Sequence, residues 1–154
     1  MMRLLPLLIA ASLAFALPAG AQEKDPVRIT ADQFVVDDAA SVATFTGKVV
    51  VKRNALTVWA PKVVVEYGAD GPSSIKSFVA SGGVRIKTAD QDATGDYAIY
   101  DPVAETLKIT GHVMVINASS TVGGPDLVID LKTNLTTFSG GGTGGRVTGI
   151  FTPQ

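Results

Sequence analysis

The fold is best predicted from one segment, Ala43-Thr44-Phe45-Thr46-Gly47-Lys48-Val49-Val50-Val51-Lys52, because versions of it recur further along the sequence. The segment alternates polar and apolar residues, as a β-strand with one buried face does, and it carries a glycine near its middle. Similar segments return at residues 79–87, 107–115 and 137–141. Their marker glycines, spaced 35, 29 and 29 residues apart, are Gly47, Gly82, Gly111 and Gly140. Such a repeat predicts a fold built from stacked copies of one unit.

A second marker precedes each copy, namely a small residue followed by a segment that ends in apolar residues. The distance from this small residue to the marker glycine is 16 residues in three units and 22 in the second. The extra residues fall in the Gly- and Ser-containing stretch 68–74, which we predict to be a loop, and residues 117–124 are predicted to form another turn. Pro61 cannot donate to a ladder and therefore predicts a break or bulge between strand pieces.

Alternation along the predicted strands assigns each side chain to a face. Apolar residues share one parity, whereas threonine, lysine and arginine fill the other. No stretch after the N-terminal apolar run shows a 3.6-residue apolar period, so we expect an all-β fold with essentially no helix. Three of the marker glycines, Gly47, Gly82 and Gly111, lie on the apolar parity, where a missing side chain lets a sheet bend. The sequence therefore predicts a creased antiparallel sheet.

An apolar sheet face without covering helices must be buried against itself or against another apolar molecule. Two creased halves can fold toward each other and enclose a slot. A slot that is open at its ends can hold acyl chains, each methylene contributing about 0.8 kcal/mol on leaving water. The alternative is a slot filled by the protein's own side chains.

The N-terminus has the three parts of a secretory signal peptide: a basic start at Arg3, an apolar run from Leu4 to Leu17, and an Ala-x-Ala end at residues 19–21. The apolar run is shorter than the roughly 20 residues of a membrane span. We therefore expect residues 1–21 to be cleaved, leaving one domain over residues 22–154, with a retained anchor as the alternative.

The composition excludes nucleic-acid binding as a function and disulfides as a source of stability. A net charge of −1 does not fit a nucleic-acid-binding surface, which needs a basic excess. The chain has no cysteine, so no disulfide stabilises it even though export leads to an oxidising compartment.

No catalytic constellation is evident, and we expect no metal and no cofactor. His112 is the only histidine, and its repeat equivalents are Lys48, Gly83 and Gly141, which indicates a solvent-facing position. Asp101 and Glu105 leave a carboxylate pair for glycan hydrolysis open as an alternative. The glycine run at residues 140–145 lacks the Lys-Ser/Thr of a phosphate-binding loop and is typical of a turn.

Four segments carry a family resemblance: residues 43–52, Ala-Pro-Lys-Val-Val-Val-Glu at 60–66, Leu-Lys-Ile-Thr-Gly-His-Val at 107–113, and Gly-Gly-Arg-Val-Thr-Gly-Ile-Phe-Thr-Pro at 144–153. The chain resembles, over about residues 26–153, the OstA-like family of periplasmic lipopolysaccharide transport proteins, the LptA family. The resemblance implies a β-taco or β-jellyroll, whose interior binds the acyl chains of lipid A without enzymatic activity. It also implies a location in the periplasm of a Gram-negative bacterium.

The resemblance further implies partners and sites. Domains of this family join head to tail by strand addition, so that lipopolysaccharide passes from an inner-membrane LptC-like to an outer-membrane LptD-like OstA domain. The expected partner edges are Val27, Arg28, Ile29 and Thr30 at one end and Arg146, Val147, Thr148, Gly149, Ile150 and Phe151 at the other. The expected lipid-binding residues, all on the apolar parity or carried over from the family's ligand face, are Val27, Ile29, Phe34, Val36, Phe45, Val49, Val51, Val58, Val65, Val84, Ile86, Tyr100, Ile109, Val113, Val115 and Ile129.

A different class of protein remains open beside this one. A structural β-solenoid that polymerises through its open edges and binds no lipid would share the repeats and the two-faced strands.

Overall fold

The computed structural model describes residues 26–140 and 145–153, and over these residues every regular element is a β-strand. The predicted signal peptide lies outside the described residues. The strands are β1 (Arg28–Thr30), β2 (Gln33–Asp37), β3 (Val42–Arg53), β4 (Leu56–Gly68), β5 (Gly71–Lys87), β6 (Asp92–Asp101), β7 (Thr106–Ile116), β8 (Ser120–Asp130), β9 (Leu135–Ser139) and β10 (Thr148–Phe151). The predicted all-β class is confirmed.

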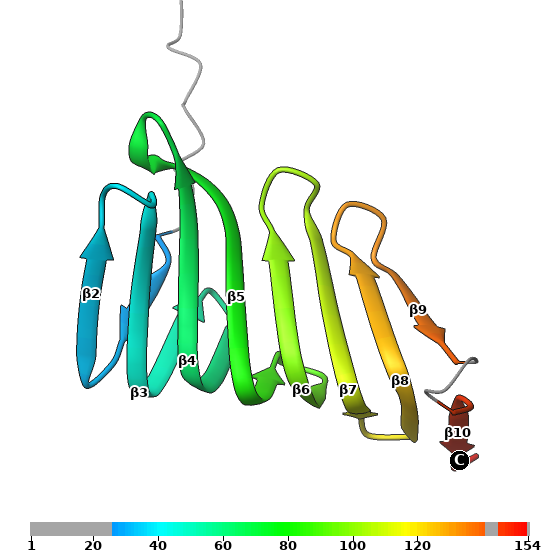
Figure 1. The fold of residues 1–154 in the computed structure, drawn as a ribbon. Coiled ribbons are helices and arrows are strands. Elements are labelled where there is room, and N and C mark those ends of the chain that lie inside the picture. The colour runs from blue at the N-terminus through cyan, green and yellow to red at the C-terminus, as the bar shows by residue number, and fades with distance from the viewer. Residues whose placement is uncertain (1–25, 141–144, 154) are drawn as a thin grey trace, which may run out of the picture.

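The strands form one antiparallel sheet, in which β3 to β8 pair with their sequence neighbours (Figure 1). Both edges of this sheet are split. At the N-terminal edge, β1 and β2 pair with successive parts of β3, and at the C-terminal edge β9 and β10 pair with different parts of β8. Each edge is therefore made of two short strands.

A crease divides the sheet into two halves that we call flap A and flap B. At the crease the register shifts on the odd-numbered long strands, between Thr46 and Val49 in β3 and between Thr110 and Val113 in β7. Flap A holds β2, β9 and residues 42–46, 62–66, 75–81, 97–101, 106–110 and 126–130. Flap B holds β1, β10 and residues 49–53, 56–60, 84–87, 92–95, 113–116 and 120–124.

Three of the four marker glycines make the crease. Gly47, Gly82 and Gly111 have φ angles of 81°, 90° and 79°, and the residue after each of them also has a positive φ. Two consecutive residues of this kind turn a strand sharply and interrupt its ladder, as in a β-bulge. The predicted crease is thus produced by backbone conformation as well as by the missing side chains.

A residue of the neighbouring segment lies close to each of these glycines, so that an added β-carbon would make a tight contact or collide. A β-carbon on Gly82 would lie 3.1 Å from Cγ of Pro61. Pro61 itself falls where the β4–β5 register shifts, between Trp59 and Lys62, so the ladder does not need the missing N–H. Of the predicted break or bulge at Pro61, the structure shows the bulge: the ladder is irregular there, while β4 continues from Leu56 to Gly68.

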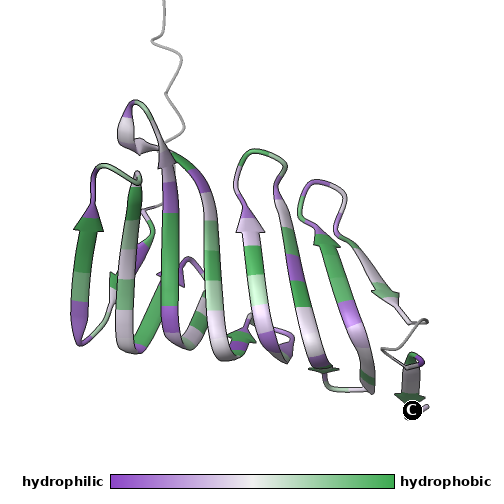
Figure 2. Ribbon diagram, in the orientation of Figure 1, coloured by the Kyte–Doolittle hydropathy of each residue, from purple (hydrophilic) through white to green (hydrophobic). Residues whose placement is uncertain are grey.

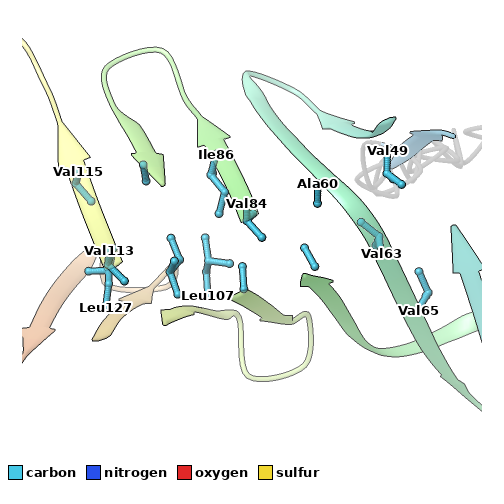
Figure 3. Packing of buried hydrophobic residues seen from close by; sticks show 14 residues of the cluster. Val49, Ala60, Val63, Val65, Val84, Ile86, Leu107, Val113, Val115 and Leu127 are labelled. Atoms are coloured by element: carbon cyan, nitrogen blue, oxygen red, sulfur yellow. The ribbon is translucent and has the colours of Figure 1, made fainter. Parts of the chain in front are cut away.

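The core lies between the two flaps and close to the crease. Ile109, Leu127, Val49 and Val63 are the largest fully buried side chains, and no polar or charged residue is buried among the described residues. Figure 2 shows the alternation of apolar and polar residues along the strands, and Figure 3 shows side chains such as Val84 and Leu107 pointing into the space between the strands. Because the sheet folds onto its own apolar face, it needs no helix to cover that face.

Two predicted loops are wrong. β4 continues to Gly68 and β5 begins at Gly71, so most of the stretch 68–74 belongs to a long hairpin. The serines there bond to the turn backbone, with Ser73 Oγ donating to the Asp70 carbonyl over 2.9 Å. Likewise β8 begins at Ser120, so only 117–119 form the predicted turn.

Candidate functional site

A groove runs between the flaps. Its larger cavity has a volume of about 390 Å³, which is within the range typical of small-molecule sites. Flap B contributes apolar side chains including Val51, Leu56 and Val58, and flap A contributes others including Phe78 and Ile129. The cavity is thus walled by both halves of the folded sheet.

A smaller cavity of about 200 Å³ lies toward the N-terminal edge. Val27 and Phe78 line both cavities, so the two adjoin. Phe34 and Phe45 stack in its wall, with ring centroids 4.6 Å apart. Together the two cavities form the groove, which extends from β1 and β2 to β9.

The mouth of the groove, by which we mean the strand ends and turns farthest from the crease, carries most of its polar side chains. The polar lining residues there are Arg53, Thr88, Asp90, Gln91, Tyr100, Asn134 and Thr136, and they lie beside the apolar Leu56 and Leu131. The Arg53 Nη1 donates a hydrogen bond of 3.3 Å to the hydroxyl oxygen of Tyr100. Since Arg53 ends the flap B part of β3 and Tyr100 lies near the end of the flap A part of β6, this bond crosses the mouth.

The end of the smaller cavity also carries a polar anchor. Tyr67 lines this cavity and its hydroxyl donates to Asp38 Oδ1 over 3.1 Å. Burial raises the pKa of the Tyr67 hydroxyl, and this hydrogen bond raises it further. Tyr67 therefore stays a neutral donor at any physiological pH and holds the β2–β3 turn against the hairpin of β4 and β5.

Turns at the open ends are fixed by aspartates. Asp101 Oδ1 accepts the backbone N–H groups of Val103 and Ala104 over 2.8 and 2.9 Å. In the β8–β9 turn, the N–H of Thr133 is the largest influence that lowers the pKa of the Asp130 carboxyl, aided by the N–H of Lys132. The geometry of the turns therefore accounts for the presence of aspartate at both positions.

The outer face of the sheet carries charged pairs. Arg85 Nε donates to Asp92 Oδ1 over 3.0 Å, which lowers the pKa of the Asp92 carboxyl, and the Arg85 guanidinium lies 5.5 Å from the ring centre of Trp59. His112 Nδ1 lies 2.8 Å from Asp96 Oδ2, and both side chains are exposed. Each pair joins neighbouring strands across the surface.

Metal-binding clusters and membrane-spanning helices are both absent from residues 26–140 and 145–153. No group of three or more His, Cys, Asp or Glu residues in this part of the chain is suited to hold a metal ion. Over the same residues, no helix has the length and apolar character to cross a membrane.

Most of the predicted lipid-binding residues line the groove. In its larger cavity these are Val27, Val51, Val58, Ile86, Tyr100, Ile109 and Ile129; in the smaller one they are Val27, Ile29, Phe34, Val36, Phe45 and Val65. The remaining four line neither cavity: Val49, Val84, Val113 and Val115. These four are buried, and three of them directly follow the crease residues, where they pack the corner.

Sequence reasoning missed several groove residues. Leu56, Phe78 and Ala80 line the larger cavity, and they alternate with outward residues like their neighbours. Arg53 was also missed, although it continues the inward parity of Val51. A charged residue on an apolar parity was the signal that would have found it.

The predicted partner edges lie at the two edges of the sheet, with shorter strands than expected. Strand β1 begins at Arg28, so that Val27 precedes it, and β10 begins at Thr148, so that Arg146 and Val147 precede it. Each edge also includes a strand beyond the prediction, β2 or β9. Exposed apolar residues on these edge strands are Phe34, Val35, Val36, Leu135, Ile150 and Phe151.

The fold and the groove define a class: an open, creased antiparallel sheet that encloses an apolar groove with a polar mouth and leaves both edges unpaired. The chain belongs to the family described as "LptA/(LptD N-terminal domain) LPS transport protein", whose model matches residues 28–135. The predicted family is thereby confirmed.

This chain is also similar to individual proteins of lipopolysaccharide export systems. The lipopolysaccharide export system protein LptA of Haemophilus influenzae is 28% identical over 155 residues, covering 96% of this chain and 88% of that protein. LptH of Pseudomonas aeruginosa, also named a lipopolysaccharide export system protein, is 25% identical over 145 residues, covering 91% and 81%. A crystal structure of LptH from that organism has the same fold, with a TM-score of 0.74 at 19% sequence identity. The match covers 84% of this chain and 96% of that chain, and LptH is described there as the LptA-homologous periplasmic component of a lipopolysaccharide transport device.

Proposed function

We propose that this protein is a non-enzymatic periplasmic carrier that shields the acyl chains of lipopolysaccharide in its groove. The observation that supports this most is the groove itself, because over the residues that the structure describes a sheet without a covering helix keeps an apolar cavity of about 390 Å³ between its flaps. Acyl chains placed there leave water, and the sugar headgroup stays at the polar mouth. Membership in a lipopolysaccharide transport family supports the same substrate.

A photo-crosslinking experiment tests this. A photoreactive amino acid at position 58 faces the larger cavity, whereas the same residue at position 57 lies on the opposite parity of β4. We expect lipopolysaccharide to crosslink at position 58 and not at 57. Equal capture at both positions, or capture at 57 alone, would contradict carriage in the groove.

We further propose that copies of the chain join head to tail, so that β9 and β10 of one copy pair with β1 and β2 of the next. Both edges are split at the crease in the same way, so a flap A strand meets a flap A strand and a flap B strand meets a flap B strand. Strand addition of this kind would align the grooves of successive copies. The end copies would then pair with LptC-like and LptD-like OstA domains of the inner and outer membrane, and lipopolysaccharide would pass along the aligned grooves.

The open edges also favour a second candidate, a structural polymer without lipid. Sedimentation against protein concentration, with and without lipopolysaccharide, separates the two. A carrier retains lipopolysaccharide in every sedimenting species, whereas a purely structural polymer assembles and retains none.

A further inference from the structure

Arg53 is the only cationic residue that lines the larger cavity among the described residues. It ends strand β3 and has the parity of Val49 and Val51, so its side chain lies on the groove side of the sheet. Its neighbour Lys52 has the opposite parity and is exposed. One cation is thus placed at the mouth of an apolar groove.

The charge of Arg53 has no carboxylate partner. Within residues 26–140 and 145–153, Arg85 forms an ion pair with Asp92 and His112 contacts Asp96, and Arg53 takes part in neither contact. Its side-chain hydrogen bond goes to a neutral phenol, the hydroxyl of Tyr100. A partly buried guanidinium that bonds only to a phenol retains donors for an anion.

We infer that Arg53 binds the phosphate of the amphiphile whose acyl chains fill the groove, an inference that rests on the proposed function. The guanidinium offers parallel N–H donors that match two phosphate oxygens. Before the ligand enters, the bond to Tyr100 holds Arg53 across the mouth. When it enters, the phosphate replaces the phenol as the acceptor, because it carries the opposite charge and can accept two parallel N–H bonds from the guanidinium, whereas the phenol accepts one.

The carboxylate of Asp90 further restricts where this phosphate can lie. Asp90 lines the same mouth from the β5–β6 turn, and its carboxylate repels a phosphate placed near it. The phosphate therefore lies on the Arg53 side of the opening. Replacing Asp90 by asparagine removes this repulsion, and we expect the Asp90→Asn variant to bind a phosphorylated lipid more tightly, by a few-fold.

The test compares two probes on the mature chain: diphosphorylated lipid A and the same lipid with both phosphates removed. We expect the wild type to prefer the phosphorylated form by about tenfold or more, the range of a charge-assisted hydrogen bond. Arg53→Gln should lose most of this preference, because its affinity for the phosphorylated lipid falls toward that for the dephosphorylated one, and Arg53→Lys should retain part of it. Lys52→Gln is the matched control, since it removes the same charge one residue away on the other face, and it should keep the full preference.

The outcomes separate the two proposals. If the wild type binds both lipids equally, or if Arg53→Gln keeps the preference while its thermal unfolding matches the wild type, the phosphate assignment is overturned and carriage in the groove stands. If neither lipid binds the wild type, both fail. A further arm uses inorganic phosphate alone: saturable binding that Arg53→Gln abolishes, without any change in the lipid preference, would mark a free-anion site and overturn the headgroup assignment.

Discussion

Gly47 and Gly111 have φ angles of 81° and 79°, and each lies against an aspartate, Asp32 in the bend between β1 and β2 or Asp96 on β6. A β-carbon on either glycine would come within 2.8 Å of the Cβ of Asp32 or Asp96. Two demands therefore coincide at one residue, a left-handed backbone and an absent side chain. Elsewhere on the crease Lys48 and His112 have φ angles of 46° and 50°, which non-glycine residues adopt at a moderate cost.

Substitution at two crease glycines separates these demands. Gly83 has a φ of 96°, and a β-carbon added there would meet no atom within 4 Å, so Gly83→Ala costs only the backbone strain, about 1–2 kcal/mol. Gly111→Ala adds the collision with Asp96 and should lower the free energy of unfolding by clearly more. Urea unfolding of both variants measures this, and equal losses would contradict the steric role of the strand neighbour.

The crease glycines could be identified from the sequence because a left-handed backbone conformation favours glycine, and this glycine recurs at the same position in the repeats. Sequence reasoning failed at Gly123 and Gly124, which resemble a turn but pair with Met114 and Val113 in the ladder of β7 and β8. A β-carbon on Gly124 would lie 3.2 Å from Cγ2 of Val147. The C-terminal segment therefore approaches Gly124 closely, and a contact between such distant parts of the chain cannot be predicted from the local sequence.

At the scale of the strands, alternation predicts the two faces but not what each inward residue touches. Leu127 and Leu56 share the inward parity, yet Leu127 is 0% exposed while Leu56 is half-buried and lines the larger cavity. The difference arises from distance to the crease, where the flaps are in contact and side chains fill the corner. Toward the strand ends the flaps separate and leave the groove.

This difference predicts unequal effects of one substitution at two sites. Leu127→Ala leaves a cavity in a packed core and should cost about 2–5 kcal/mol of unfolding free energy. Leu56→Ala removes a side chain that already borders a cavity, so it should cost well under half as much and weaken lipopolysaccharide retention instead. Denaturant unfolding and a retention assay on the same two proteins check this, and a reversed order would place the packed core elsewhere.

The β8–β9 turn predicts a pH dependence. Backbone donors hold the pKa of Asp130 below its unfolded value, so the ionised carboxylate stabilises the fold at neutral pH. That contribution is present above the unfolded pKa of about 3.9 and is lost as the pH falls through the lower folded value. Asp130→Asn should therefore lower the melting temperature at pH 7 and have a smaller effect near pH 2.5. An effect of the same size at both pH values would contradict a role for the charge.

At the scale of the whole molecule, the mouth of the groove joins residues that sequence reasoning cannot bring together. Arg53 and Tyr100 are 47 residues apart and belong to different repeats, and they meet because the crease folds flap B onto flap A. Parity marks both as inward, but only the closed fold shows that they lie on opposite sides of one opening. The inward residues of the site were therefore predictable from parity, whereas the contact of Arg53 with Tyr100 across the mouth was not.

The split edges give the last prediction. Ile150 lies on β10 at the C-terminal edge and is 64% exposed, so a neighbouring copy that adds its strand there would cover it. A lysine on an edge strand opposes such pairing. We therefore expect Ile150→Lys to reduce the sedimentation coefficient at high protein concentration to that of a monomer, with groove binding of lipopolysaccharide unchanged. Val103→Lys is the matched control, since Val103 is 76% exposed but lies in the β6–β7 turn, away from both edges.

The control decides how the result is interpreted. If Ile150→Lys dissociates the assembly and Val103→Lys does not, the C-terminal edge carries the contact between copies, because the two variants add the same charge. If both dissociate it, net charge rather than strand addition governs association. If neither does, head-to-tail pairing through β10 is wrong, and lipopolysaccharide would have to travel on single copies rather than along aligned grooves.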